Sequence, residues 1–168
     1  MAHTLYILST SVHLFAAVIW VGCLVFMSLM LAPALRDMGN PALTARLIQA
    51  IGKRFKFIGW LCLTALLFTG FTNLTLRGYS HRELISLDFW QSPYGDTLAW
   101  KLVLFAGIIG LSLTHDLLAG PRLRRMRETD PARAETYRTL ASWMGRVTLL
   151  LSILVTLFAV MLVRGRPW

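Results

Sequence analysis

Residues 12–31 read VHLFAAVIWVGCLVFMSLML, and this stretch decides the fold. It contains no formally charged residue and is long enough to cross a lipid bilayer, for which a helix of about 20 apolar residues suffices. One residue, His13, does not suit a lipid-facing helix. If the helix begins near Leu5, His13 lies roughly 12 Å below its first turn, at 1.5 Å of rise per residue. Because an ionisable side chain inside a membrane is costly, His13 is a functional candidate.

The helical face that carries His13 favours a ligand site. Ala16, Ala17 and Trp20 share this face, so the surface beside the imidazole is first small and then broad and aromatic. Such a surface suits a flat ligand or a metal ion. The alternative is a histidine that only hydrogen-bonds a neighbouring helix, and the sequence leaves both interpretations open.

The composition assigns the chain to the membrane. Only 15% of its residues are charged, whereas soluble domains carry about 25%. Seventeen Lys and Arg against eight Asp and Glu give a net charge of +9, but these residues fall in short connections between apolar spans. That distribution indicates membrane topology, so nucleic acid is not an expected partner. Both cysteines, Cys23 and Cys62, lie inside apolar spans and predict no disulfide framework.

Four apolar spans predict an all-α integral membrane protein, a four-helix transmembrane bundle that forms one domain over residues 1–168. The spans cover about 5–32, 57–76, 98–119 and 143–163. The first and third connections are rich in Lys and Arg, which predicts that they face the cytoplasm and that both termini lie outside the inner membrane. Short interfacial helices are expected in the connections: a basic amphipathic helix over 42–56, and a further helical stretch capped by Asp130. No internal repeat is evident.

An outer depth of the bundle collects the residues that could join His13. Helix direction brings Asn73 of the second span and Lys101 of the third span to this level, and His81 follows in the outer connection. Asn73 and Cys62 share one helical face, which is expected to turn away from lipid. Alternatively, Asn73 only links helices and Lys101 only extends to the membrane surface.

An inner depth collects softer ligands and further polar groups. Its members are Cys23, Met27, Cys62, His115 and Arg146. Thiolate and thioether groups suit copper, but the cysteines also fit simple packing, and His115 also fits an interfacial pair with its neighbour Asp116. The middle of the fourth span is predicted to be apolar and without a ligand.

Two motifs in this sequence resemble the membrane domain of copper resistance protein D (CopD). They are HLFxxxIWVG over residues 13–22 and PYGxxLxxKLxLF over residues 93–105, joined by Phe26, Gly70 and Asn73. The resemblance covers nearly the whole chain. It implies copper handling, with a soluble periplasmic copper-binding protein as partner.

The order of His13, Lys101 and His115 is also similar to that of the HemJ-type protoporphyrinogen oxidases, which are related small membrane proteins. This second resemblance implies a b-type haem site that involves the residue matching His13. It also implies a functional lysine at the position of Lys101.

The leading hypothesis is a small haem b-binding membrane protein, redox-active or porphyrin-handling. Helix bundles commonly house such cofactors, and an imidazole can ligate the iron. His13 would be the axial ligand and Trp20 and Asn73 would line the site; Lys101 or His81 would be the second ligand, with His115 a weaker candidate. Any enzymatic activity would then be that of a membrane oxidoreductase.

Two other hypotheses remain. One is a copper-binding or copper-transporting protein that uses His13 together with sulfur ligands of the inner depth. The other is a structural or assembly subunit of a larger membrane complex. The expected partners are the lipid bilayer, a second copy of the chain or a larger membrane complex, and a periplasmic metal or electron-transfer protein.

Overall fold

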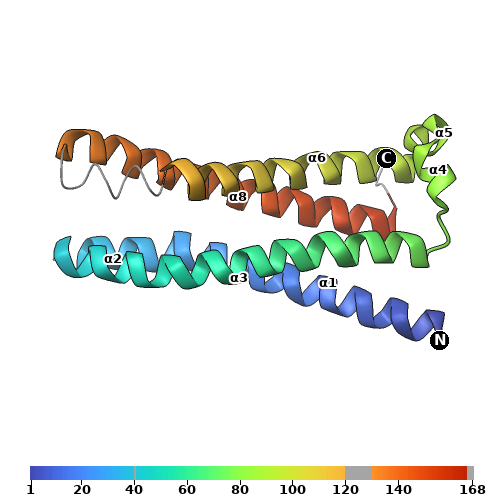
Figure 1. Ribbon diagram of the computed structural model, residues 1–168, viewed down its shortest axis with the longest axis horizontal. Helices are drawn as coiled ribbons and strands as arrows, with labels where there is room; N and C mark the ends of the chain where they lie inside the picture. Colours follow the sequence, from blue (N-terminus) through green and yellow to red (C-terminus); the bar gives the residue numbers. More distant parts are fainter. Residues whose placement is uncertain (40, 120–129, 166–168) are drawn as a thin grey trace. The chain divides into compact units, whose positions relative to one another are not determined.

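The computed structural model describes residues 1–39, 41–119 and 130–165. Among these residues, four helices are long and apolar enough to cross a membrane (Figure 1). They are His3–Leu35, Arg46–Leu76, Pro93–Leu118 and Thr136–Arg164. The predicted all-α membrane fold with four spanning helices is therefore confirmed. Residues 120–129 of the predicted third connection, which covers 120–142, lie outside the described residues.

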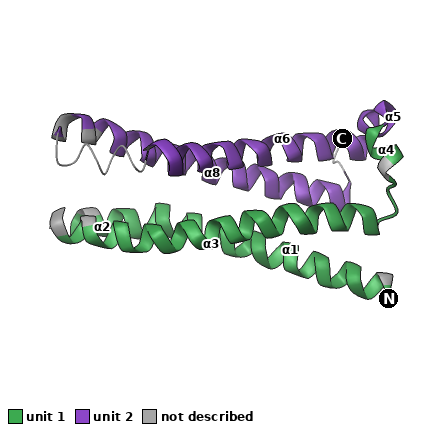
Figure 2. Ribbon diagram, in the orientation of Figure 1, with its two compact units in different colours: residues 1–85 green, residues 86–168 purple. Residues whose placement is uncertain are grey.

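The chain divides into two compact units, residues 1–85 and 86–168 (Figure 2). The first contains α1 (Ala2–Val25), the π-helix η1 (Phe26–Leu31), α2 (Ala32–Asp37), α3 (Pro41–Leu76) and α4 (His81–Ile85). The second contains α5 (Leu87–Gln91), α6 (Pro93–Thr114), the π-helix η2 (His115–Ala119) and α8 (Pro131–Arg164). Within the units α1 packs along α3 and α6 packs along α8. The single domain over 1–168 stays a prediction.

The two units are built alike, each as a hairpin of long helices. In both, the first long helix passes into a π-helix, which has six residues in η1 and five in η2. In both, the second long helix begins at a proline, Pro41 or Pro131, and runs for 36 or 34 residues. The two units are alike in the lengths of their long helices and in the position of the π-helix, but not in their residue types. For this reason no internal repeat is evident in the amino-acid sequence.

Two helix boundaries differ from the sequence-based expectation. The basic stretch 42–56 is not a separate helix, because α3 runs from Pro41 through Leu76 without interruption. Isolated glycines are the weakest helix formers in that stretch, and each costs only about 1 kcal/mol relative to alanine. The helix after Asp130 likewise continues into the fourth span as α8. The predicted cap there is confirmed, since the Asp130 carboxylate accepts a hydrogen bond from the Arg133 amide at 3.1 Å.

Trp20 joins α1 to α3. Its indole is 6% exposed and stacks on Phe55, with 6.1 Å between ring centroids. The ring lies directly on Gly59, where a Cβ atom would come within 2.8 Å of Trp20 Cζ3. A glycine is required at this crossing, because a larger side chain would displace the indole. Trp20 thereby helps to set the register of the two helices.

Arg77 links α3 to α1 at the end of the hairpin that carries the N-terminus. Its Nε donates to the Tyr6 hydroxyl at 3.1 Å, and its guanidinium lies 5.9 Å from the centre of the Tyr6 ring. Together with Trp20, this contact aligns α1 and α3 over their common length.

A buried hydroxyl stripe runs through the α6–α8 hairpin. Thr148 and Ser152 of α8 and Thr97 of α6 are all buried. On α8 each hydroxyl donates to the carbonyl four residues earlier, from Thr148 at 2.9 Å, from Ser152 at 2.8 Å and from Thr156 at 2.9 Å. This satisfies the polar groups and leaves small side chains at the helix contact. The fourth span, whose middle is predicted to be apolar, thus carries buried hydroxyl groups that are hydrogen-bonded within the helix.

The turn before α6 explains the local sequence Ser-Pro-Tyr-Gly. The Ser92 hydroxyl accepts a hydrogen bond from the Gly95 amide at 3.0 Å, and Pro93 occupies the first turn of the helix. The backbone of α5 passes so close to Gly95 that a Cβ atom there would overlap the carbonyl group of Phe89. The motif thus caps the first turn of α6 and lets the backbone of α5 pack closely against it.

Candidate functional site

The candidate site lies between α1 and α3 and is centred on His13. The His13 Nδ1 atom is 2.8 Å from the hydroxyl oxygen of Thr69. The same hydroxyl donates to the backbone carbonyl of Ala65 at 2.6 Å. The imidazole is half-buried and is held by a side chain 56 positions away in the sequence.

The hydrogen bonds of Thr69 determine how the His13 ring is protonated. A hydroxyl has one proton, and that of Thr69 is directed to Ala65, so its oxygen accepts from His13 Nδ1. In the neutral ring the lone pair then resides on Nε2. This arrangement, in which a partner fixes one ring nitrogen and the other presents its lone pair, is typical of metal-ligating histidines.

Small and polar groups surround the ring. The contact between α1 and α3 is here called the α1–α3 seam. About one turn nearer to the N-terminus along this seam, the Thr10 hydroxyl donates to Asn73 Oδ1 at 3.3 Å. A Cβ atom at Gly70 would come within 3.5 Å of His13 Cε1, so the glycine leaves space against the imidazole. Ser9 Oγ, one turn before His13, is buried and has no hydrogen-bond partner among the described residues. The seam therefore has room and polar atoms beside the ring.

The structure brings together some of the predicted site residues. Asn73 lies about one turn from the level of His13 and contacts α1 through Thr10, and Cys62 on the same helical face is 5% exposed. Trp20 lies against Gly59 and Phe55, where it has a packing role; its place beside a ligand stays a prediction.

The remaining predicted residues lie on other elements. Lys101 is half-buried on α6, in the second unit. His115 begins η2; its side chain is 45% exposed and its Nδ1 lies 3.2 Å from Asp116 Oδ1, which fits an interfacial pair. His81 begins α4, where the preceding Ser80 amide and hydroxyl hydrogen-bond the carboxylate of Glu83 and hold its pKa below the usual value.

Thr69 is the residue whose role the sequence did not reveal. It shares a helical face with Cys62 and Asn73, and that spacing was the available signal. Among the described residues, no group of three or more His, Cys, Asp and Glu side chains gathers into a metal cluster. The site is thus a single imidazole with an ordered partner, in a seam that also contains two free thiols, Cys23 and Cys62.

These features define a helical membrane protein with a half-buried histidine that is hydrogen-bonded between two spanning helices. Residues 49–162 match the family model of copper resistance protein D, and the chain belongs to this CopD family. It is a copper-resistance-related membrane protein. The matched region includes the predicted PYGxxLxxK motif and Lys101, and it begins within α3, so His13 precedes it.

One relative is an uncharacterized protein of Aquifex aeolicus (strain VF5). It is 32% identical over 149 residues, which cover 88% of this chain and 88% of the relative. No solved structure matches the chain. The similarity to the HemJ-type oxidases stays a prediction.

Proposed function

We propose that this protein handles copper within the inner membrane and that His13 is its principal nitrogen ligand. The observation that carries the proposal is the 2.8 Å contact between His13 Nδ1 and the Thr69 hydroxyl, which fixes the orientation of the imidazole; Nε2 would then be the ligand atom. Imidazole is a suitable ligand for copper. The CopD family match supports copper rather than another metal.

The position of His13 fits an ion that arrives from outside. It lies about 12 Å along α1 from the level of Leu5, at 1.5 Å per residue. A soluble periplasmic copper-binding protein could deliver the ion to that end of the hairpin. In this proposal copper is the cargo, and His13 with its neighbours Asn73 and Ser9 forms the first place where it is held.

The test is the copper content of the purified chain. Cys23→Ser/Cys62→Ser protein is loaded with Cu(II) in detergent, freed of excess metal, and examined by metal analysis and electron paramagnetic resonance. We expect about one copper per chain, with hyperfine coupling to imidazole nitrogen, because a single ordered imidazole is offered. A chain that retains no copper would refute the proposal.

Haem b is the second candidate, and one observation favours it. The seam offers one imidazole rather than a cluster of protein ligands, and a porphyrin brings four nitrogen ligands of its own, so that one or two axial ligands suffice. Gly70 leaves space against the ring. If haem binds, His13 would hold the iron. A Soret band in the protein as purified would select this function over copper.

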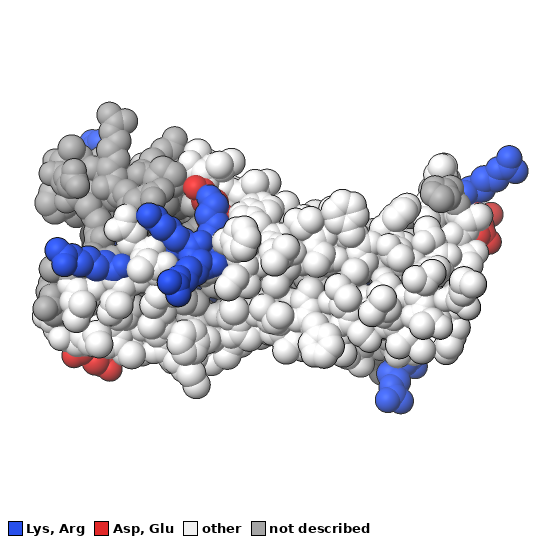
Figure 3. Space-filling model, turned by 60° about the horizontal axis from the view of Figure 1, so that its bottom comes forward, with Lys and Arg blue, Asp and Glu red and all other residues white. Residues whose placement is uncertain are grey.

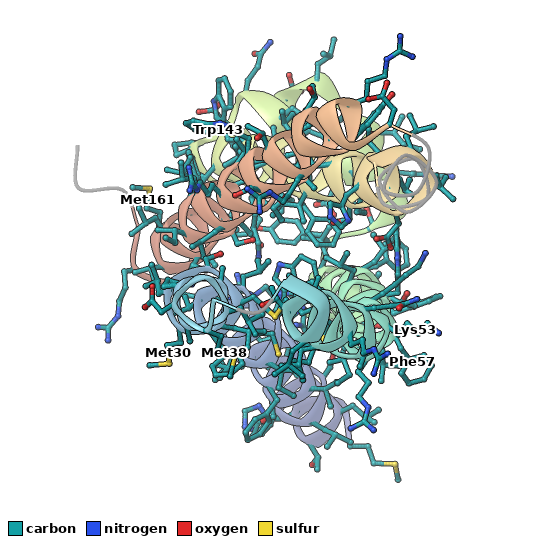
Figure 4. The ribbon with its side chains drawn as sticks, turned by 90° about the vertical axis from the view of Figure 1, so that its left-hand side faces the viewer. Met30, Met38, Lys53, Phe57, Trp143 and Met161 are labelled. Atoms are coloured by element: carbon teal, nitrogen blue, oxygen red, sulfur yellow. The ribbon has the colours of Figure 1, made fainter. Side chains whose placement is uncertain are left out.

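The proposed topology puts both termini outside. Exposed Arg46, Lys53, Arg54 and Lys56 all lie in the first half of α3, and Lys53 extends outward from that helix (Figure 4). Lys and Arg side chains lie towards the helix ends, and the stretch between them is uncharged on the face shown in Figure 3. Because basic segments remain in the cytoplasm, this half of α3 is inside.

Thiol labelling of intact cells tests the topology. In the cysteine-free chain, a membrane-impermeant reagent is expected to label Glu83→Cys and to spare Lys53→Cys until the cells are opened. Both positions are exposed, so access rather than burial decides the result. The reverse labelling pattern would invert the topology.

A further inference from the structure

Three sulfur-containing residues of the first unit, on α1, η1 and α3, lie inward of His13 along the α1–α3 seam. Cys23 lies on α1 and is half-buried, and Cys62 lies on α3 and is 5% exposed. Both are free thiols. Met27 follows Cys23 by one turn, on the same side of the helix, and is also half-buried. No part of the proposed nitrogen site uses these residues.

The register of the hairpin places the two cysteines near one contact between α1 and α3. Tyr6 pairs with Arg77 and Thr10 pairs with Asn73, so that four residues forward on α1 correspond to four residues backward on α3. Further along the hairpin Trp20 contacts Gly59, and Cys23 and Cys62 each lie three residues from this contact, or about 4.5 Å along the helix axis. A charge on one thiol acts electrostatically on the other, which agrees with this proximity.

The π-helix η1 distinguishes this part of the seam from the rest of α1. Met27 is its second residue, and the Met27 carbonyl accepts from the Ala32 amide five positions later. π-Helical turns are rare and frequently accompany functional sites. Met30 of the same π-helix is 64% exposed and points outward (Figure 4), so only one of these two thioethers is turned towards the seam.

We propose that Cys23, Cys62 and Met27 form a binding site for a cuprous ion in the α1–α3 seam. Thiolate and thioether sulfur are soft ligands that select Cu(I). When the ion binds, each thiol releases its proton to solvent and the sulfur forms a bond to copper. Copper remains Cu(I) throughout, so no oxidant or reductant is required.

The charge of the site suits its place in the helix. Two thiolates and one Cu(I) leave one negative charge, and the basic residues Lys53, Arg54 and Lys56 occupy α3 just beyond Cys62 on its cytoplasmic side. His13 is ten residues from Cys23, or about 15 Å along α1. This inference rests on the proposed copper function and adds to it a second, inward position for the same cargo.

Alkylation of the unmodified chain tests the site without any substitution. Cu(I) is added under anaerobic conditions, the chain is treated with N-ethylmaleimide, and the modified cysteines are identified by mass spectrometry. We expect Cu(I) to protect both Cys23 and Cys62, because each sulfur lone pair is bound to the metal. Equal modification with and without Cu(I) would overturn the proposal.

Competition with a Cu(I) chelator measures the contribution of each sulfur. Cys23→Ser or Cys62→Ser is expected to lower Cu(I) affinity by at least about 100-fold, and Met27→Leu by about 10-fold, the scale typical of losses at metal sites. Met30→Leu is the matched control and should bind like the unchanged chain. If Met27→Leu also binds like the unchanged chain, Met27 is not a ligand.

The outcomes separate this site from the nitrogen site. His13→Ala should keep the Cu(I) protection of both cysteines, because it lies about three turns away. If the cysteine-free chain failed to retain Cu(II) while Cu(I) still protected both cysteines of the unchanged chain, only the proposed role of His13 would be rejected. Cu(II) binding in the cysteine-free chain, without Cu(I) protection in the unchanged chain, would reject the sulfur site alone.

Discussion

His13→Ala is expected to abolish copper binding at the nitrogen site, with a loss of affinity of more than about 100-fold, greater than that caused by losing an outer partner of a ligand. Among the described residues with described side chains, His13 is the histidine that is both half-buried and hydrogen-bonded to the neighbouring helix of the hairpin. If the bound group is haem b, the same substitution removes the haem. Metal content and the optical spectrum of the purified variant measure both results.

Substitutions of Thr69 are expected to lower the affinity for copper less than His13→Ala does. Thr69→Val keeps the shape of the side chain but removes the acceptor of the Nδ1 proton, and affinity should fall about 10- to 100-fold, as for outer-shell partners of metal ligands. Thr69→Ser restores the hydroxyl and should restore binding. This rescue would not occur if Thr69 served only to fill space.

His3→Ala is the control for the loss of a histidine. His3 is exposed in the first turn of α1, and its replacement should leave binding unchanged. Full copper or haem occupancy in His13→Ala would contradict the assignment. A loss confined to His115→Ala would move the site to the start of η2.

The spanning helices could be predicted from sequence because apolar length is a local property. His13 could be singled out for the same reason, since an ionisable group in an apolar stretch is visible without knowledge of its neighbours. The hydrogen bond between His13 and Thr69 could not be predicted from sequence. It depends on the register of two helices, and that register is set by the packing of Trp20 on Gly59 and by the Tyr6–Arg77 contact.

Two other differences have physical causes that the hydropathy pattern conceals. Thr148, Ser152 and Thr156 follow each other at four-residue intervals, which is a visible helical stripe, but their apolar neighbours dominate the span. The flat indole of Trp20 suits either of two roles, lining a ligand or covering a glycine, so the residue type alone does not predict which role it has. The glycine it covers, Gly59, is on another helix.

Gly95→Ala is expected to destabilise the α5–α6 turn and, with it, the second hairpin, by about 3 kcal/mol or more, at the upper end of the range for overpacking. The new Cβ atom would overlap the Phe89 carbonyl and lie 2.9 Å from Trp90 Cα. Both are backbone groups, so no side-chain rotation relieves the overlap. Gly95 has no positive φ, and the effect is therefore one of space and not of backbone conformation.

Gly110→Ala on the same helix is the matched control for this prediction. A Cβ atom there meets nothing within 4 Å, and alanine favours a helix by about 1 kcal/mol over glycine. The two variants should therefore shift in opposite directions when the fraction of monodisperse, helical protein in detergent is followed against temperature. Equal unfolding temperatures for Gly95→Ala and the unchanged chain would show that α5 does not rest on Gly95. If Gly110→Ala were as unstable as Gly95→Ala, added volume on α6 would be harmful in general, and the close contact at the Ser-Pro-Tyr-Gly turn would not be its cause.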